Sequence, residues 1–192
     1  LGSAMAKRFA EHGARLALID LSQGPLDKLA DSLEGHKPLT IACDITSEQA
    51  VCDAFATIQQ QAGRLDVLVN NAGITRDALL LNFRDGITES RMSFEDWNAV
   101  INVNLNGVFL CGREAAETFA RQGTGGAIIN ISSIARSGNI GQSNYTASKA
   151  GVAAMTVTWA RELSRHGIRV NAISPGVINT EMVRAMKPGA RE

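Results

Sequence analysis

The sequence of 192 residues has few features of membrane, nucleic-acid-binding or disulfide-rich proteins. Its three cysteines, Cys43, Cys52 and Cys111, have spacings that fit neither a disulfide framework nor a metal site. The 19 basic and 19 acidic residues give a net charge of zero, which argues against binding to nucleic acid or to an acidic membrane. Without a bilayer-length apolar run or a signal-peptide pattern, we expect a cytoplasmic protein.

Aromatic residues are also scarce, at 5%, and Tyr145 is the only tyrosine. Lys149 follows it by four residues, a spacing that puts both side chains on one face of a helix. A free phenol has a pKa of about 10, and a fixed ammonium beside it would lower that pKa. The pair would then exchange a proton with an alcohol more readily. The same spacing also occurs on ordinary exposed helix faces.

Helical and strand-like segments alternate along the whole chain. Helices are predicted over residues 3–12, 26–33, 47–62, 93–121 and 142–165, and strands over 14–19, 38–42, 66–69, 127–131 and 168–173. The strands are short and apolar along their length, which is typical of a parallel sheet covered by helices on both faces. The pattern predicts one α/β domain with a three-layer, doubly wound sheet. Residues 74–95 are less regular and predict a surface excursion with a turn.

Polar residues or Pro-Gly follow each predicted strand, where ligands bind in such sheets. They are Asp20, Asp44, Asn70-Asn71, Ser132-Ser133 and Pro175-Gly176. An acid at the position of Asp20 accepts hydrogen bonds from the adenosine ribose of a dinucleotide and repels a 2′-phosphate. We therefore expect NAD(H) to be preferred, with NADP(H) possible. An ordinary turn aspartate is the alternative for Asp20.

Two further strand ends are candidates for cofactor contacts. Asp44 would accept a hydrogen bond from the adenine amino group, or it is simply an acid that leads into a helix. Asn71, Ala72 and Gly73 leave little bulk at a strand end, which suits the close approach of a ligand. A plain asparagine-rich turn is the alternative for that segment.

Five motifs in this order resemble the short-chain dehydrogenase/reductase family, specifically its bacterial 3-oxoacyl-[acyl-carrier-protein] reductase type. They are Asn70-Asn71-Ala72-Gly73, Asn104-Leu105-Asn106-Gly107, Ile131-Ser132-Ser133, Tyr145-x-x-x-Lys149 and Pro175-Gly176. The resemblance covers essentially the whole chain and implies a Rossmann-like fold. It also implies hydride transfer between a nicotinamide and a ketone or secondary alcohol, most of all a 3-oxoacyl thioester on an acyl carrier or coenzyme A.

The resemblance assigns roles to four side chains. Tyr145 would be the general acid in reduction, and Lys149 would lower its pKa and bind the nicotinamide ribose. One serine of the Ser132-Ser133 pair would orient the carbonyl oxygen. Asn104 would hold a water of the proton relay, in preference to Asn102 and Asn106.

The residues expected to contact the cofactor share positions at the strand ends or in the family's nicotinamide loop. They are Gly2, Asp20, Asp44, Ile45, Asn71, Ala72, Gly73, Tyr145, Lys149, Pro175, Gly176, Ile178 and Thr180. No metal ligands are expected. The resemblance also implies a homotetramer or homodimer formed through the helices that carry Asn104 and Tyr145.

The sequence departs from the family pattern in several places. Only Leu1-Gly2 matches the end of the glycine-rich phosphate loop, and we expect a single domain over residues 1–192 that lacks the first strand and the C-terminal helix and strand. The family spacing of serine to tyrosine is thirteen, which selects Ser132, but strand register favours Ser133. Residues 82–92 resemble an insertion that lies at the substrate mouth or on the surface.

Two other functions remain open on the sequence. One is a dehydrogenase of another secondary alcohol, such as a sugar, a polyol or a steroid. The other is a dinucleotide-binding redox sensor without catalysis. The presence of serine, tyrosine, lysine and asparagine together favours an enzyme, because a binding protein has no need of the acid.

Overall fold

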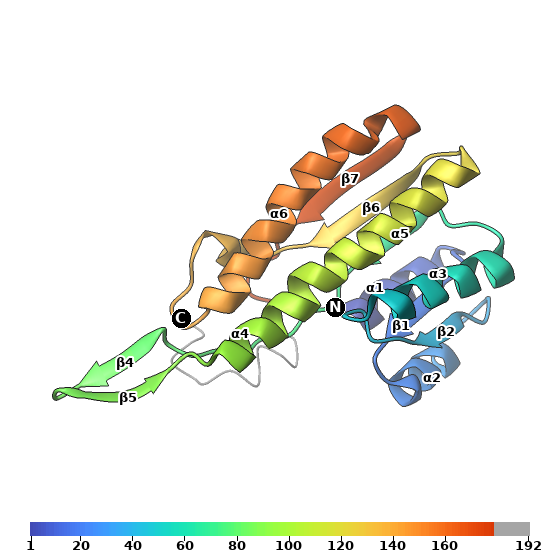
Figure 1. Cartoon of the computed structure of the whole chain (residues 1–192). Coiled ribbons are helices and arrows are strands. Elements are labelled where there is room, and N and C mark those ends of the chain that lie inside the picture. Colours follow the sequence, from blue (N-terminus) through green and yellow to red (C-terminus); the bar gives the residue numbers. More distant parts are fainter. Residues whose placement is uncertain (179–192) are drawn as a thin grey trace.

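The structure is a computed structural model that describes residues 1–178 (Figure 1). Its helices are α1 (Gly2–Glu11), α2 (Gln23–Asp31), α3 (Glu48–Ala62), α4 (Phe94–Ile101), α5 (Gly107–Gln122) and α6 (Ser143–Leu163), with shorter turns η1 (Asn102–Asn106), η2 (Ile134–Ser137) and η3 (Ser164–His166). Its strands are β1 (Ala17–Asp20), β2 (Leu39–Ala42), β3 (Val67–Asn70), β4 (Leu81–Arg84), β5 (Ile87–Arg91), β6 (Gly126–Ile131) and β7 (Ile168–Ile173). All predicted strands form, and so do the predicted helices, with ends shifted by a few residues and with an interruption in the helix predicted over residues 93–121.

The strands of the α/β core pair in parallel, as predicted, but in two separate sheets. One sheet has the order β1-β2, and the other has the order β3-β6-β7. In the register, Asp20 lies beside Ala42, and Asn70 lies beside Asn130. The carboxyl ends of β3, β6 and β7 therefore meet at one edge.

Burial on both faces, which the apolar strands predict, holds for β6 only. Ala127, Ile128 and Ile131 on this strand are buried. By contrast, both ends of β1 are exposed, and Val67 at the start of β3 is 43% exposed. The difference follows from position, since β6 is the central strand of its sheet and β1 and β3 are edge strands in the described part of the chain.

Helices α3 and α5 supply most of the core. Ser47 caps α3 by accepting a hydrogen bond from the backbone N–H of Ala50, as its sequence position predicts. Buried residues at three- and four-residue spacing follow on α3, namely Val51, Ala54, Phe55 and Ile58. Val51, Ala54 and Phe55 form one cluster with side chains of α5 such as Phe119 and with Ile128 of β6. Full burial of each large side chain stabilises the fold by roughly 1.5–3 kcal/mol.

The long helix predicted over residues 93–121 is not continuous. Ser93 caps its start, accepting from the backbone N–H of Asp96 at 2.9 Å. The five residues of η1 then form a π-helical turn between α4 and α5. Such turns are rare, and they occur frequently at functional sites. Among residues 1–178, none of the helices has the length and apolar character that crossing a membrane requires.

Residues 81–91 form an antiparallel hairpin rather than an irregular excursion. Its strands β4 and β5 are joined through Asp85 and Gly86, which have φ values of 52° and 78°. Positive φ at both central residues is typical of the tight hairpin turn that Asp-Gly favours. The turn expected at this position is therefore present, whereas the two strands beside it were not predicted.

Candidate functional site

Helix α6 places Tyr145 and Lys149 side by side. The Lys149 Nζ lies 5.7 Å from the centroid of the Tyr145 ring. Lys149 is only 3% exposed, and Tyr145 is partly buried. The predicted proximity of phenol and ammonium is therefore present, within a largely desolvated environment.

The end of β6 holds this part of α6 through two hydrogen bonds. Lys149 Nζ donates to the carbonyl oxygen of Ile131 at 2.7 Å. In return, Ser132 Oγ donates to the carbonyl oxygen of Lys149 at 2.8 Å. Burial lowers the pKa of the Lys149 ammonium to about 8, because a charged group is disfavoured away from water.

The pKa of Tyr145 differs from the sequence expectation. Burial of the phenol raises its pKa, the Ser133 hydroxyl beside it opposes this shift, and the Asp77 carboxylate raises the pKa further. The expected net lowering by Lys149 is not seen, because burial outweighs it. In this structure the phenol is held in its protonated form at neutral pH.

The two adjacent serines point to different partners. Ser132 is 2% exposed, and its hydroxyl is used in the bond to the backbone of α6. The Ser133 hydroxyl lies close enough to the phenol of Tyr145 to oppose the rise of its pKa, and its Oγ accepts from the backbone N–H of Ala135 at 3.1 Å. The structure thus brings Ser133 to the tyrosine, as strand register indicates, although a spacing of thirteen points to Ser132.

Asn104 lies in the π-helical turn and is completely buried. Its Oδ1 accepts from the backbone N–H of Ile74 at 2.8 Å, and its Nδ2 donates to the carbonyl oxygen of Ile74 at 2.9 Å. Asn102 and Asn106 instead bond to each other at the surface, with 2.9 Å between Nδ2 and Oδ1. Asn104 therefore fixes the segment that follows β3, and it alone of the three reaches the site.

Small residues after β3 lie close to these groups. A Cβ atom at Gly73 would lie 3.3 Å from Asn104 Oδ1 and 3.6 Å from Lys149 Nζ, and one at Gly2 would lie 2.9 Å from Asn71 Nδ2. Ala72, which stands between Asn71 and Gly73 in the sequence, is exposed. Glycine at position 73 keeps open the space beside the ammonium, and glycine at position 2 allows the close approach of Asn71.

The loop after β7 completes this edge. The carbonyl oxygen of Pro175 accepts from the backbone N–H of Ile134 at 3.1 Å. A Cβ atom at Gly176 would lie 3.9 Å from Ile134 Cδ1. Ile178 is 40% exposed, and Thr180 lies outside the described residues. The structure therefore gathers Asn71–Gly73, Ser133, Tyr145, Lys149 and Pro175–Gly176 at the carboxyl edge of the larger sheet.

The acidic candidates lie on the smaller sheet. Asp20 ends β1 and is exposed, and its Oδ1 accepts from the backbone N–H of Ser22 at 3.4 Å. Asp44 follows β2, and its Oδ1 accepts from the Thr46 hydroxyl at 2.7 Å and backbone N–H at 2.9 Å, which lowers the pKa of the carboxyl. Ile45 packs closely on Gly107, where a Cβ atom would lie 2.7 Å from its Cδ1.

Sequence reasoning missed several polar residues around the start of α6. Asn144 is completely buried, and its Nδ2 donates to the carbonyl oxygens of Arg76 at 3.0 Å and Asp96 at 3.2 Å. Gln142 donates to Asp77 Oδ2 at 3.0 Å. The Arg76-Asp77 segment, expected to be a solvated turn, is thus bound to the residues before Tyr145. Two amide side chains within three residues of the tyrosine were the available signal.

A chain of buried side-chain hydrogen bonds connects the strands and the helix of this site. Asn70 Nδ2 donates to Asn130 Oδ1 at 2.9 Å, and Asn130 Nδ2 donates to Thr156 Oγ1 at 2.9 Å. The three residues are between 0% and 7% exposed. They connect β3, β6 and α6, and so fix the strand that Asn71 follows relative to the helix that carries Lys149.

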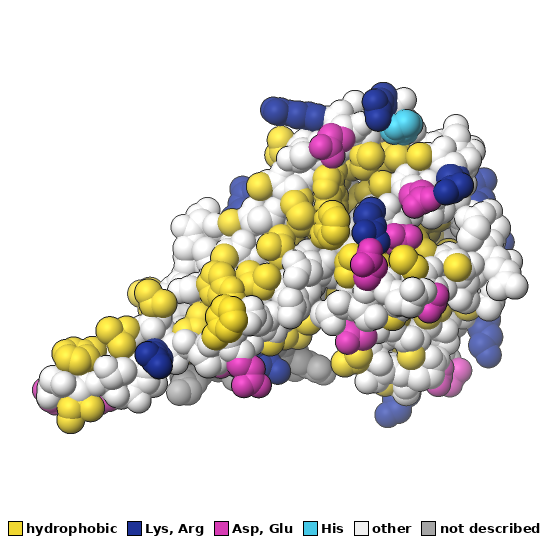
Figure 2. All heavy atoms as spheres, viewed as in Figure 1, with side chains coloured by type: hydrophobic (Ala, Val, Ile, Leu, Met, Phe, Trp, Pro, Cys, Tyr) yellow, Lys and Arg dark blue, Asp and Glu magenta, His cyan; other side chains and the backbone are white. Residues whose placement is uncertain are grey.

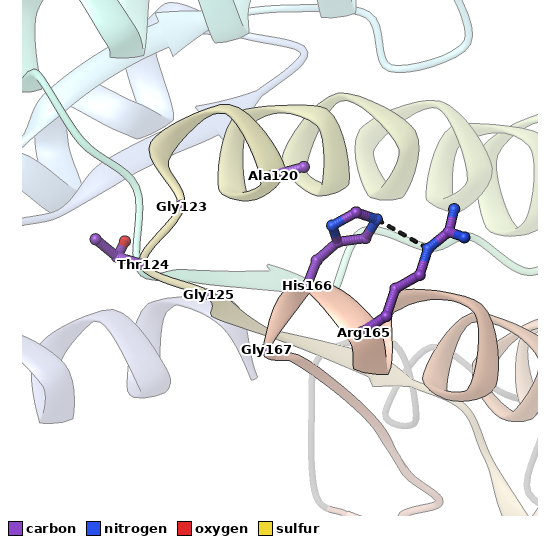
Figure 3. A pocket seen from close by; sticks show the side chains of 7 residues that line it. All are labelled: Ala120, Gly123, Thr124, Gly125, Arg165, His166 and Gly167. Carbon is purple, nitrogen blue, oxygen red and sulfur yellow. Dashed lines mark hydrogen bonds between the residues drawn. The ribbon is translucent and has the colours of Figure 1, made fainter.

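A hollow of about 460 Å³ lies at the opposite end of the larger sheet (Figure 3). It is lined by Ala120, Gly123, Thr124, Gly125, Arg165, His166 and Gly167. Arg165 Nε donates to His166 Nε2 at 3.2 Å. Since β6 and β7 begin here, the hollow is separate from Tyr145. Residues 1–178 contain no cluster of three or more potential metal ligands among histidine, cysteine, aspartate and glutamate.

Comparison with known proteins gives consistent matches over nearly the whole chain. A family model described as short chain dehydrogenase matches residues 1–190. The 3-oxoacyl-[acyl-carrier-protein] reductase FabG of Thermotoga maritima is 44% identical, and the match covers 100% of this chain and 75% of that protein. The (3R)-3-hydroxyacyl-CoA dehydrogenase of Canis lupus familiaris is 40% identical, covering 96% of this chain and 72% of that protein. The crystal structure of a short-chain type dehydrogenase/reductase from Mycobacterium marinum matches with a TM-score of 0.87 at 34% identity, covering 95% and 70% of the two chains.

Proposed function

The chain belongs to the short-chain dehydrogenase family, and from this premise we propose that it reduces the ketone of a 3-oxoacyl thioester with a nicotinamide cofactor. The observation that carries the proposal is the contact of Tyr145 with both Ser133 and Lys149 at the carboxyl edge of the larger sheet. The names of the similar proteins from Thermotoga maritima and Canis lupus familiaris support an acyl thioester as the substrate.

The proton donor in this proposal is the phenol of Tyr145. A phenol, with an ordinary pKa of about 10, is already protonated at neutral pH, which is the form required to give a proton to the ketone oxygen during reduction. Ser133, whose hydroxyl lies beside the same phenol, orients that oxygen. Positioned acid-base catalysis of this kind contributes roughly 10²–10⁴ to the rate.

The space beside Lys149 fits a bound dinucleotide. Gly73 and exposed Ala72 leave room next to the ammonium, where a larger side chain would fill it. When bound, the nicotinamide supplies the hydride. Lys149 binds hydroxyl groups of the nicotinamide ribose, and Asn71 and Pro175–Gly176 border the same space. Asn104 fixes the position of the segment after β3 through its hydrogen bonds to the backbone of Ile74. Because both polar atoms of the Asn104 side chain are hydrogen-bonded to Ile74, a water of the proton relay would bind the backbone of Asn104.

Asp20 favours NAD(H) over NADP(H) in this proposal. It is exposed at the end of β1, where its carboxylate accepts hydrogen bonds from the ribose hydroxyls and repels a 2′-phosphate. Asp44 and Ile45 border the adenine, and Gly2 lies at the start of α1 near Asn71. We also propose self-association through α5 and α6, on which Phe109 and Val157 are 43% and 53% exposed.

A substrate panel tests the function. Nicotinamide absorbance is followed with acetoacetyl thioesters of coenzyme A and of a carrier protein, and with sugars, polyols and steroids. Acetoacetyl thioesters should give the highest kcat/KM. Preferred turnover of a sugar, polyol or steroid contradicts the substrate class but not the family.

The substitution Tyr145→Phe separates an enzyme from a redox sensor. The variant should lose roughly 10²–10⁴ of its turnover, because only the proton donor is removed. Binding of the cofactor, measured by nicotinamide fluorescence, should be retained. A protein without catalysis would show no turnover before or after the change.

A further inference from the structure

Asn144, which directly precedes Tyr145 at the start of α6, is a buried polar side chain with no role in the proposed reaction. It is 0% exposed. Its Nδ2 donates to the carbonyl oxygens of Arg76 at 3.0 Å and Asp96 at 3.2 Å, and its Oδ1 accepts from the backbone N–H of Tyr145 at 2.7 Å. An asparagine amide has two N–H donors and one acceptor oxygen, so both polar atoms are engaged. These bonds join α6 to α4 and to residues 74–78, the segment after β3.

The bond to Tyr145 replaces the usual cap of a helix. The backbone N–H of Tyr145 belongs to the first turn of α6, where such groups have no partner within the helix. A side chain at the N-cap position usually accepts from one of them. Here the N-cap residue is Gln142, which makes no side-chain cap and donates to Asp77 Oδ2 at 3.0 Å instead. Asn144 supplies the acceptor and so fixes the backbone of the residue that carries the phenol.

The segment that Asn144 holds leads into the β4–β5 hairpin. The hairpin projects from the body of the molecule (Figure 1), and Figure 2 shows its apolar side chains at the surface. Every residue of β5 is exposed, and Phe83 of β4 is 61% exposed. A two-stranded hairpin without a surface to pack on is marginally stable in water. Packing of the hairpin therefore does not hold residues 74–78, and their position depends on hydrogen bonds from the body of the fold.

The same segment is held by a second buried amide, that of Asn104. Asn104 bonds both backbone polar groups of Ile74, and Asn144 bonds the carbonyl oxygen two residues further on. Gly73, the neighbour of Ile74, borders the space proposed for the dinucleotide. The cofactor side of the site and the helix that carries the phenol are thus bonded to one short run of backbone.

We propose that Asn144 is a positioning residue that acts through Tyr145, an inference that rests on the proposed reduction. It binds neither ketone nor cofactor, because its polar atoms are bonded within the chain. By joining the Tyr145 backbone to the segment beside the dinucleotide, it keeps the phenol within reach of the ketone oxygen. A misplacement of about 1 Å can lower the rate roughly 10²-fold. Loss of Asn144 should therefore lower kcat and leave cofactor binding unchanged, since Asn104 still holds the cofactor side.

A double-mutant cycle with Tyr145→Phe tests this route. Asn144→Ala should lower kcat roughly 10²-fold for the ketone of the substrate panel that is reduced fastest, without changing the dissociation constant of the nicotinamide cofactor. Asn144→Asp, which keeps the size and the acceptor but removes both donors when ionised, should lower kcat as well. In the Tyr145→Phe background neither change should lower the residual turnover further, because the phenol is absent. An equal loss in both backgrounds, or no loss in either, overturns the inference.

Gln122→Ala is the matched control. The Gln122 amide accepts from the backbone N–H of Leu65 and donates to the Leu65 carbonyl oxygen, both at 2.7 Å. Gln122 ends α5 beside the start of β6, at the opposite end of the sheet from Tyr145. This variant should lose stability, as Asn144→Ala does, but the folded protein should keep its kcat. A comparable fall of kcat in both variants would mean that lost stability alone lowers the rate, which contradicts the proposal.

The ring of Tyr145 gives a measurement that needs no turnover, because it is the only tyrosine. In protein with isotope-labelled tyrosine, the single NMR ring signal should shift and broaden in Asn144→Ala and stay in place in Gln122→Ala. An unmoved signal in the folded Asn144 variants overturns the inference, whereas a shifted signal without turnover of any ketone contradicts the proposed function alone. Hydrogen exchange on the unmodified protein needs no variant: the Tyr145 N–H should exchange slowly, and exchange as fast as in an unfolded chain overturns the inference.

Discussion

Lys149 Nζ donates a hydrogen bond to the carbonyl oxygen of Ile131 across 2.7 Å, which ties the start of α6 to the end of β6. This bond draws the ammonium away from the phenol hydroxyl and onto a backbone oxygen. Burial of the phenol and the Asp77 carboxylate raise the pKa of Tyr145 in spite of a lysine one helical turn away. The first prediction concerns this lysine.

Lys149→Met should change the pH dependence of stability. The pKa of Lys149 is about 8 in the fold and 10.5 unperturbed, so the unfolded chain binds more protons between these values. The free energy of unfolding of the native protein should therefore rise relative to the variant by about 3 kcal/mol from pH 7 to pH 10.5. Urea unfolding of both proteins across this pH range measures the change. A difference in unfolding free energy that does not vary with pH would contradict a buried lysine with a lowered pKa.

Ser133→Ala and Ser132→Ala should have different effects. Loss of the hydroxyl that bonds Tyr145 should lower kcat by roughly 10²-fold with little change in stability. Loss of the Ser132 hydroxyl removes the donor to the Lys149 carbonyl and should cost about 1–3 kcal/mol of stability. Steady-state kinetics and urea titrations on both variants decide the assignment, and the reverse pattern would move the role to Ser132.

Asp20→Asn should weaken the preference for NADH. Removing the negative charge relieves repulsion of the 2′-phosphate, and the ratio of kcat/KM for NADPH to that for NADH should rise roughly tenfold or more. Asp31→Asn, a neutralisation of an exposed acid at the end of α2, is the control and should leave the ratio unchanged. A native protein that already prefers NADPH strongly would refute the role given to Asp20.

Asn130→Leu should destabilise the fold more than its size suggests. Asn70 Nδ2 loses its buried acceptor, at about 1–3 kcal/mol for the orphaned group, and Thr156 Oγ1 loses one donor while keeping its bond to the carbonyl oxygen of Val152. Thr158→Val, at an exposed threonine of the same helix, should change stability by less than about 0.5 kcal/mol. Chemical denaturation compares the two, and equal effects would show that the amide chain is not a stabilising element.

Much of the fold could be predicted because each core strand is a short apolar run that ends in polar residues. The same rule located Asp20, Asn71 and Ser133, and helical spacing paired Tyr145 with Lys149. The π-helical turn could not be found in this way, since it accompanies the bonds of Asn104 to Ile74, thirty residues away in the chain. The hairpin was missed because the alternation of apolar and polar residues is confined to the four residues of β4, while Ile87 is the one apolar residue of β5.

Proton affinities were the least predictable property. The spacing of Tyr145 and Lys149 fixes their proximity, but the pKa of each depends on burial and on the Ile131 carbonyl, which tertiary packing brings into place. The contacts of Gln142 with Asp77 and of Asn144 with Arg76 span more than sixty residues of sequence. Local patterns carry no information about such long-range bonds.

The packing of α3 on α5 has a consequence for the cofactor candidates. Asp20 and Asp44 belong to β1-β2, and the reacting groups lie beside β3-β6-β7. In residues 1–178, side chains packed between α3 and α5, such as Phe55 and Phe119, join these two parts of the fold. Repacking that helix contact will therefore alter how well a dinucleotide spans both sheets, even though neither phenylalanine lies at a strand end where the cofactor is expected.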